Sequence, residues 1–363
     1  MKKFITLFGL LFSTLTAAQS CDTLFVLQDA GETNALIPVI EQSEQNHDNF
    51  AILVGGVAAE IIGKHPTLKH HTITYPQLQI DEKLDKAWKR DQKISEVSLF
   101  KIKNGFPAKK IVSGVAFEFQ GQLLECSEVP TFAYWDNINF QGTDPYFQTA
   151  KKVAILADHL MVPSNSFRVM YPNAAVVGQP TFEAWKADLE QINPKAVRSK
   201  LPFSTPSPII VFVGGYGDEY NQALSQFLDA AENFPTYTIL LSVHPKFEGK
   251  VEKKELAKRS LPHVHIVDQI SSMEAIALAD TVVCHQSSVG VQAAFADKSV
   301  IYWIPEDQTY TNPLIEQKIT PKASNSEDLK IALSSSKPEA NLFTLLKVPM
   351  NSVFLLYTYI HER

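Results

Sequence analysis

The fold of this chain is decided by one stretch, Asp280-Thr281-Val282-Val283-Cys284-His285-Gln286-Ser287-Ser288-Val289-Gly290. Its apolar part predicts a buried strand, Thr281–Cys284, and the polar residues that follow predict a turn. Small and apolar residues then continue through Ala294, which predicts a helix that begins at the serines. A buried strand that leads directly into a helix is the repeating unit of an α/β fold with a parallel sheet.

The same unit recurs on both sides of this stretch. We predict a first series of strands at Thr23–Gln28, Ala51–Val54, Lys110–Val112, Thr131–Tyr134, His159–Val162 and Ala175–Val177. We predict a second series at Ile209–Val213, Thr238–Val243, Val264–Val267, Thr281–Cys284 and Ser299–Trp303. The segment Gln179–Pro208 between the two series is polar and holds five prolines, which is typical of a helix plus linker.

The chain therefore divides into two Rossmann-like domains. We place the N-terminal domain at residues 21–180, the linker at 181–207, the C-terminal domain at 208–340 and a C-terminal segment at 341–363. Two such domains face each other across a cleft at the carboxyl ends of their strands, where α/β folds bind ligands.

The composition excludes several classes of protein. A chain of 363 residues with 45% hydrophobic and 20% charged residues suits two globular domains rather than disorder. The formal net charge of -6 argues against a nucleic-acid partner, which needs a basic surface. The pairs His70/His71 and His263/His265 lack further ligands at a recognised spacing, so no metal site is predicted.

The first 20 residues predict a signal peptide. Lys2 and Lys3 precede an uncharged, mostly apolar run, Phe4–Ala18, which is short for a membrane span. We expect export to the periplasm or cell envelope, with cleavage before Gln19. Cys21 follows closely, so a lipid anchor is an alternative route to the membrane, although Ala18 stands where a lipoprotein signal usually has Leu.

Three segments of the C-terminal half can bind a phosphate. Gly214 and Gly215 follow a β-branched strand and let the backbone approach an anion, although a tight turn explains them equally. Ser287 and Ser288 can bind an anion at the helix start or simply cap the helix. His244 and Lys246 follow the strand Thr238–Val243, where they can meet a diphosphate or serve the structure alone.

The N-terminal half offers acids and aromatic residues for a sugar. Trp135, Asp136 and Asn137 follow a predicted strand, and a ring beside a carboxylate and an amide can line an acceptor pocket. Core packing is the alternative for Trp135. Glu118, Asp29 and Glu32 compete for the role of general base, and Asp29 and Glu32 can instead cap the next helix.

The order of these motifs resembles the donor-binding domain of the GT-B superfamily of glycosyltransferases and UDP-GlcNAc 2-epimerases. The glycine loop is followed by His244-Pro245, by Asp280–Val283, by the two serines and by the strand Lys298–Tyr302. The resemblance is nearest to polysialyltransferase-like, CDP-glycerol transferase-like and capsule Kdo-transferase-like proteins. In the first domain, Gly31-Glu32 and the segment Val176–Pro180 fit the same layout.

This resemblance implies that His244, Ser287 and Ser288 contact the donor phosphates. Gln292 stands where many GT-B enzymes have a glutamate that binds the donor ribose, and its amide lacks that charge. We therefore expect a transferase for an envelope glycan or glycolipid, with a nucleotide-linked or lipid-linked donor and no other cofactor. Two alternatives stay open: an exported GT-B-like protein that binds a glycan or phosphorylated ligand without turnover, and a UDP-sugar 2-epimerase-like enzyme.

Overall fold

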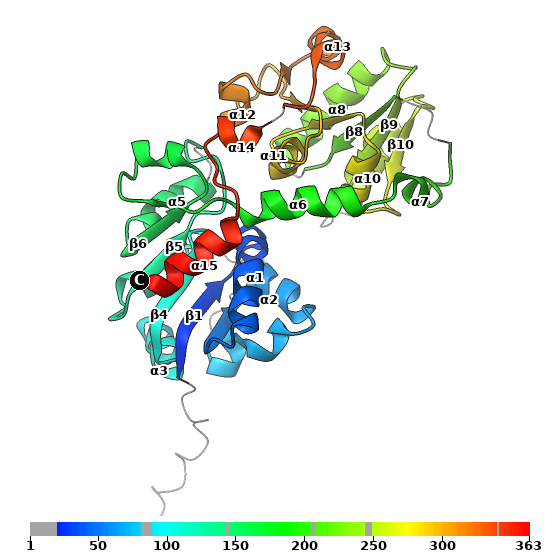
Figure 1. Ribbon diagram of the computed structural model, residues 1–363. Helices are drawn as coiled ribbons and strands as arrows, with labels where there is room; N and C mark the ends of the chain where they lie inside the picture. The colour runs from blue at the N-terminus through cyan, green and yellow to red at the C-terminus, as the bar shows by residue number, and fades with distance from the viewer. Residues whose placement is uncertain are drawn as a thin grey trace, which may run out of the picture.

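The chain folds into two α/β lobes connected by a long helix, α6 (Pro180–Gln191) (Figure 1). The computed structural model describes residues 20–80, 89–142, 145–204, 208–215, 217–243, 249–339 and 341–363. Each lobe contains one parallel sheet with helices packed against it. The predicted fold class, an α/β fold with two Rossmann-like domains, is confirmed.

The N-terminal sheet has seven strands in the order β3-β2-β1-β4-β5-β6-β7, all paired in parallel. Their bounds are β1 Cys21–Leu27, β2 Phe50–Val54, β3 Thr72–Thr74, β4 Ala108–Gly114, β5 Thr131–Tyr134, β6 His159–Val162 and β7 Ala175–Val176. The C-terminal sheet has six strands in the order β10-β9-β8-β11-β12-β13. Their bounds are β8 Ile209–Val213, β9 Thr238–Ser242, β10 Val264–Val267, β11 Thr281–Cys284, β12 Val300–Trp303 and β13 Lys322–Ala323.

The helices of the N-terminal lobe are α1 Ala30–Gln45, α2 Gly56–Gly63, α3 Glu96–Gly105, α4 Glu118–Glu125 and α5 Pro145–Ala154, with three 3-10 helices at Leu68–His71, Tyr75–Leu78 and Asn165–Val169. After α6 come α7 Pro194–Arg198, α8 Asp218–Ala231, α9 Lys250–Leu256, α10 Ser272–Leu278, α11 Ser288–Phe295, α12 Pro313–Glu316, α13 Ser326–Ser335, α14 Leu342–Leu345 and α15 Ser352–Glu362.

The predicted strands agree closely with the observed ones. β5, β6, β8, β10 and β11 have the predicted bounds, and the other predicted strands differ by one or two residues at one or both ends. Two strands were not predicted, β3 and β13. Both are short and lie at the edge of a sheet, where the residues of β3 are only half-buried and carry no continuous apolar run.

The C-terminal segment returns to the first lobe. Helix α15 packs beside α1 (Figure 1). Lys110 Nζ donates to the Ile360 carbonyl at 2.6 Å, and Tyr357 Oη donates to Asp48 Oδ2 at 3.0 Å. Where the chain crosses back, Glu183 of α6 accepts hydrogen bonds from the backbone N–H groups of Asn351 and Ser352. Helix α6 and the segment before α15, which both connect the lobes, are thus hydrogen-bonded to each other.

Cys21 is the first residue of β1 and is buried, with 3% of its surface exposed. Its backbone N–H donates to the Pro107 carbonyl at 3.2 Å, and its side chain belongs to the N-terminal core. The lipid anchor at this sulfur stays a prediction. Residues 1–19, which carry the predicted signal peptide, lie outside the described residues. In the described part of the chain, no helix has the length and apolar character to cross a membrane.

Candidate active site

A cleft of about 690 Å³ lies between the two lobes. Its walls are formed by residues that follow β1 and β5 on one side and β8 and β11 on the other. These are the carboxyl ends of strands, as expected for a ligand site in parallel sheets. We refer to the two sides as the N-terminal wall and the C-terminal wall.

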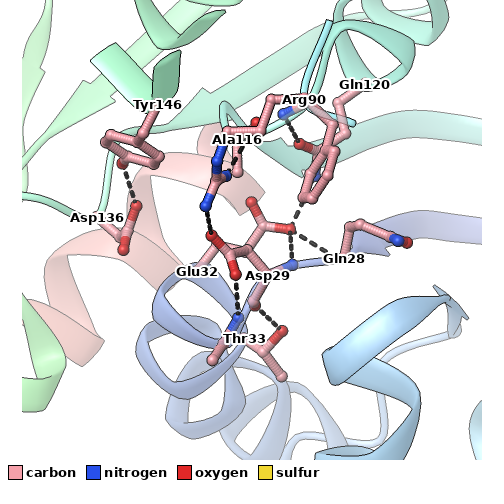
Figure 2. Close-up of polar contacts among 11 residues, drawn as sticks. Gln28, Asp29, Glu32, Thr33, Arg90, Ala116, Gln120, Asp136 and Tyr146 are labelled. Carbon is pink, nitrogen blue, oxygen red and sulfur yellow. Dashed lines mark hydrogen bonds and ion pairs between the residues drawn. The ribbon is translucent and has the colours of Figure 1, made fainter. Parts of the chain in front are cut away.

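The N-terminal wall begins with a capping box at the start of α1 (Figure 2). Asp29 is the N-cap residue, and its Oδ1 accepts from the Ala30 N–H at 3.0 Å. Glu32 Oε1 reaches back and accepts from the Asp29 N–H at 3.1 Å and the Gln28 N–H at 2.6 Å. An acidic N-cap followed three residues later by Glu is the sequence pattern that forms this arrangement. Capping, one of the two predicted roles of Asp29, is confirmed. Asp29 also lines the cleft, and its role as a general base stays a prediction.

Glu32 is completely buried behind this wall rather than in the cleft, so its predicted role as a cleft base is wrong. Its Oε1 also accepts from Gln120 Nε2 at 2.8 Å, whereas Oε2 has no hydrogen-bond partner among the residues that the structure describes. Burial, followed by the charge of Asp29, raises the pKa of Glu32 to about 8. A Cβ at position 114 would lie 1.5 Å from Glu32 Oε2, so Gly114 makes room for this carboxyl.

Arg90 neutralises Asp29. Its guanidinium donates to Asp29 Oδ2 at 3.0 Å and to the Ala116 carbonyl at 3.1 Å (Figure 2). The same group lies 5.1 Å from the ring centroids of both Phe117 and Tyr146. Stacking between two rings and pairing with a carboxylate hold the guanidinium in one orientation.

Asp136 is the carboxylate best placed for acid–base chemistry. It follows β5, is half-buried in the cleft, and its Oδ1 accepts from Tyr146 Oη at 2.7 Å (Figure 2). Burial raises the pKa of Asp136 to about 6, although the bond from Tyr146 opposes this shift. A Cβ at position 31 would lie 2.0 Å from Asp136 Oδ2, so Gly31 lets the first turn of α1 pass beside this carboxyl. A carboxyl group that titrates near neutral pH in a cleft suits a general base.

The C-terminal wall is built around the start of α11. Ser287 is the N-cap residue, and its Oγ accepts from the Val289 N–H at 3.2 Å. The cleft is lined here by five predicted residues, Gly214, Gly215, Ser287, Ser288 and Gln292. The first N–H groups of a helix lack partners within it, and its dipole favours an anion. This wall therefore has the chemistry of a phosphate site.

His285 was not predicted as a site residue, although it stands in the stretch that decided the fold. It lines the cleft with 4% of its surface exposed, and its Nε2 lies 2.6 Å from Gln308 Oε1. Burial lowers the pKa of His285, which favours the neutral ring. Its position directly after a buried strand could have identified it. Arg90 and Tyr146 carried no such signal, because they lie far from any predicted strand end.

Several other predictions need correction. Trp135 is completely buried, and its ring packs against Phe167 at 5.4 Å and Tyr171 at 6.1 Å, so its prediction as a sugar-stacking residue is wrong. Glu118 lies outside the cleft as the first residue of α4, where Lys152 Nζ approaches its Oε1 to 2.6 Å. Asn137 lines the cleft as predicted.

The predicted phosphate ligands His244 and Lys246 lie outside the described residues. Among the described residues, no group of three His, Cys, Asp or Glu side chains is placed to hold a metal ion.

Solved structures share this arrangement of two lobes, whereas no sequence comparison finds a relative. No family model matches the chain, and no curated protein sequence matches it. UDP-GlcNAc 2-epimerase from Neisseria meningitidis, solved with bound UDP-GlcNAc, superposes with a TM-score of 0.69 at 13% identity, over 94% of this chain and 100% of that one. The UDP-GlcNAc 2-epimerase from Methanocaldococcus jannaschii gives 0.67 at 12% identity, with the same coverage of both chains. The chain has the GT-B fold.

MurG from Acinetobacter baumannii is also similar, with a TM-score of 0.55 at 12% identity over 94% of this chain and 100% of that one. At these identities the likeness extends to the GT-B fold and not to individual side chains. The chemistry of this protein therefore depends on the side chains of its own cleft.

Proposed function

We propose that this protein is a glycosyltransferase that binds a glycosyl diphosphate in the cleft between its lobes. The observation that carries the proposal is the pairing of two unlike walls. The helix start with Ser287 and Ser288 suits a diphosphate, and Asp136 with its raised pKa lies on the opposite wall. The bound UDP-GlcNAc in the Neisseria structure supports a sugar nucleotide as one form of this donor.

In the proposed reaction, Asp136 removes the proton from an acceptor hydroxyl. The acceptor oxygen forms a bond to the anomeric carbon of the sugar, and the bond from that carbon to the diphosphate oxygen breaks. The diphosphate leaves with the bonding electron pair, which the N–H groups and hydroxyls at the start of α11 stabilise. Gln292, one turn further along α11, offers an amide to a hydroxyl of the donor.

The source of the diphosphate depends on the compartment. We propose an envelope glycan or glycolipid as acceptor, because residues 1–20 predict export. Nucleotide sugars are cytoplasmic in bacteria, so an exported enzyme would use a lipid-linked donor. N-terminal sequencing of the protein from fractionated cells distinguishes these cases: a mature chain that begins at Gln19 supports the lipid-linked donor, and an uncleaved cytoplasmic chain supports a nucleotide sugar.

A 2-epimerase-like reaction is the second candidate. It is supported by the two epimerases described above and by the presence of two acids, Asp29 and Asp136, on one wall. Epimerisation at C2 replaces a carbon-bound hydrogen, whereas glycosyl transfer leaves it in place. Incubation with UDP-GlcNAc in deuterated water therefore separates the two: deuterium at C2 of recovered sugar favours the epimerase.

The proposal is tested first by ligand-induced thermal stabilisation. UDP, CDP, UMP, CMP and an undecaprenyl-phosphate analogue are titrated against the protein. At a hundredfold excess over the Kd, a bound ligand stabilises the native state by about 2.7 kcal/mol. We expect Ser287→Ala to weaken the response, and Ser334→Ala to retain it, because Ser334 is an exposed serine of α13 whose hydroxyl donates to Ile331.

The absence of a response to every phosphate compound, in a folded sample, would reject a diphosphate donor. A protein that binds a glycan without turnover would then be the better explanation.

A further inference from the structure

The ring of His285 is held from behind the C-terminal wall. His285 follows β11 and lines the cleft, whereas its partner Gln308 is 7% exposed and does not line it. His285 Nε2 lies 2.6 Å from Gln308 Oε1, and Gln308 Nε2 donates to the Glu219 carbonyl at 2.8 Å. Glu219 belongs to the first turn of α8. The end of β11, the segment after β12 and the start of α8 are thus joined by two consecutive hydrogen bonds.

The Glu219 carbonyl decides which way the Gln308 amide points. A carbonyl oxygen only accepts hydrogen bonds, so the amide nitrogen of Gln308 has to face it. The amide oxygen of Gln308 then faces His285, and this oxygen also only accepts. The hydrogen between the two side chains must therefore be carried by His285 Nε2, which fixes the tautomer of the ring.

The second ring nitrogen of His285, Nδ1, is left as an acceptor. It has no hydrogen-bond partner among the residues that the structure describes, and it is not one of their buried unpartnered atoms. Nδ1 is therefore accessible, and the cleft is the space that His285 lines. Burial lowers the pKa of His285, which keeps the ring neutral at pH 7. In a neutral imidazole with its hydrogen on Nε2, Nδ1 carries a lone pair.

A lone pair at this place limits which ligand group can lie against it. An ionised phosphate oxygen only accepts hydrogen bonds, so it cannot pair with Nδ1, whereas a hydroxyl can donate to it. His285 stands two residues before Ser287, the N-cap of the helix start that suits a diphosphate. The ring thus lies beside the phosphate site, where the groups attached to a diphosphate would be found.

We propose that His285 Nδ1 accepts a hydrogen bond from a hydroxyl that the ligand carries beside its diphosphate, and that Gln308 is the positioning residue that keeps Nδ1 unprotonated. His285 is then a specificity-determining residue and not a phosphate ligand. This contact rests on the proposed function, because it needs a diphosphate in the cleft. The hydroxyl belongs either to the transferred sugar or to the ribose of a nucleotide, and the experiment distinguishes the two.

The tautomer is measured without any ligand, by NMR of the protein labelled with ¹⁵N in histidine. At pH 7 we expect a protonated Nε2 and an unprotonated Nδ1 in the ring whose signals disappear in His285→Gln. Gln308→Met keeps an unbranched side chain and loses the amide, so a population with the hydrogen on Nδ1 should appear. A purely structural role of Gln308 would leave the tautomer unchanged. A protonated Nδ1 in the wild type would overturn the proposal.

The hydroxyl contact is measured by isothermal titration calorimetry with two matched pairs of probes. Farnesyl diphosphate has no hydroxyl on carbon, and farnesyl-diphospho-GlcNAc adds those of the sugar. UDP carries ribose hydroxyls, and UDP-GlcNAc adds the same sugar. His285→Gln keeps an amide that can donate to Gln308 and removes the Nδ1 acceptor.

His285→Gln should weaken the hydroxyl-bearing probes by about 3-fold to 10-fold, the effect of one lost hydrogen bond, and leave farnesyl diphosphate unchanged. Weaker binding of UDP places the hydroxyl on the ribose. Weaker binding of the two GlcNAc probes alone places it on the sugar.

His263→Gln is the matched control. His263 Nε2 lies 3.0 Å from the Ala231 carbonyl and the residue does not line the cleft, so the same substitution should leave all four affinities unchanged. If His285→Gln does not fold, the ring is assigned with Gln308→Met and the wild-type Nδ1 signal is followed instead. It should shift when a hydroxyl-bearing probe binds and stay in place with farnesyl diphosphate.

Equal affinities of wild type and His285→Gln for every probe that binds would overturn the hydroxyl contact and leave the proposed function intact. An equal loss of affinity for farnesyl diphosphate, or in His263→Gln, would overturn it as well. If none of the four probes bound the folded wild type, the proposed function would be rejected and the hydroxyl contact with it.

Discussion

The two walls of the cleft achieve a binding surface by different means. The C-terminal wall uses a glycine turn and the start of one helix, so its polar groups come from neighbouring residues such as Ser287 and Ser288. The N-terminal wall uses side chains from separate segments, such as Asp29 with Arg90, which are 61 residues apart, and Asp136 with Tyr146, which are 10 residues apart. A wall of local backbone groups can hold a constant charge such as phosphate, whereas a wall of paired side chains can tune the pKa of a reactive group.

The largest effect on turnover is expected from a substitution at Asp136, which separates the roles of the two walls. Asp136→Asn keeps an acceptor for Tyr146 Oη but removes the base, so turnover should fall by about 100-fold to 10,000-fold. Thermal stabilisation by UDP should persist, because the phosphate groups are held by the other wall. Wild-type turnover should rise as the pH increases through about 6, since the base acts when deprotonated. If Asp136→Asn lost both turnover and stabilisation by UDP, phosphate binding and base catalysis would not be assigned to separate walls.

The second prediction concerns Glu32, behind the N-terminal wall, and the pH dependence of the protein's stability. The pKa of Glu32 is raised to about 8 in the folded protein, from about 4.3 in an unfolded chain, so the folded state binds the proton more tightly. Stability should therefore decrease as the pH rises from about 4.3 to about 8, by at most about 1.4 kcal/mol per pH unit from this group.

Glu32→Gln tests this contribution directly. Glutamine keeps the acceptor for Gln28, Asp29 and Gln120 and cannot ionise, so the decrease from this group should disappear. Urea unfolding of both proteins between pH 5 and 8 measures it. Equal slopes for wild type and Glu32→Gln would contradict the assignment.

The smallest effect is expected at Glu118. Its ion pair with Lys152 lies on the surface, outside the cleft, and exposed pairs of this kind contribute little to stability. Glu118→Gln should leave turnover and the response to UDP unchanged. A loss of turnover comparable to that of Asp136→Asn would restore Glu118 as the base and displace Asp136.

The sequence alone was sufficient where a feature depends on residues close together in the chain. The strands β5, β6, β8, β10 and β11 were predicted with their bounds, because buried parallel strands appear as continuous apolar runs. The helix start at Ser287 was predicted for the same reason, since capping involves a side chain and the next few N–H groups. The capping box of Asp29 and Glu32 is equally local, and the sequence had offered capping as one of their two roles.

Only the tertiary structure decided which of the candidate acids faces the cleft. Asp29, Glu32, Glu118 and Asp136 all stand near the ends of predicted strands or the starts of helices, so their sequence contexts are alike. They lie in different places because Arg90 and Tyr146 approach from other segments, Gln120 bonds to Glu32 in the core, and Asp136 lines the cleft between the lobes. Trp135 was misplaced for the same reason: a strand alternates its faces, and whether the next ring turns to the core or the cleft depends on what packs there. Burial and charge pairing are properties of the assembled lobes, and they set the pKa values on which the proposed chemistry depends.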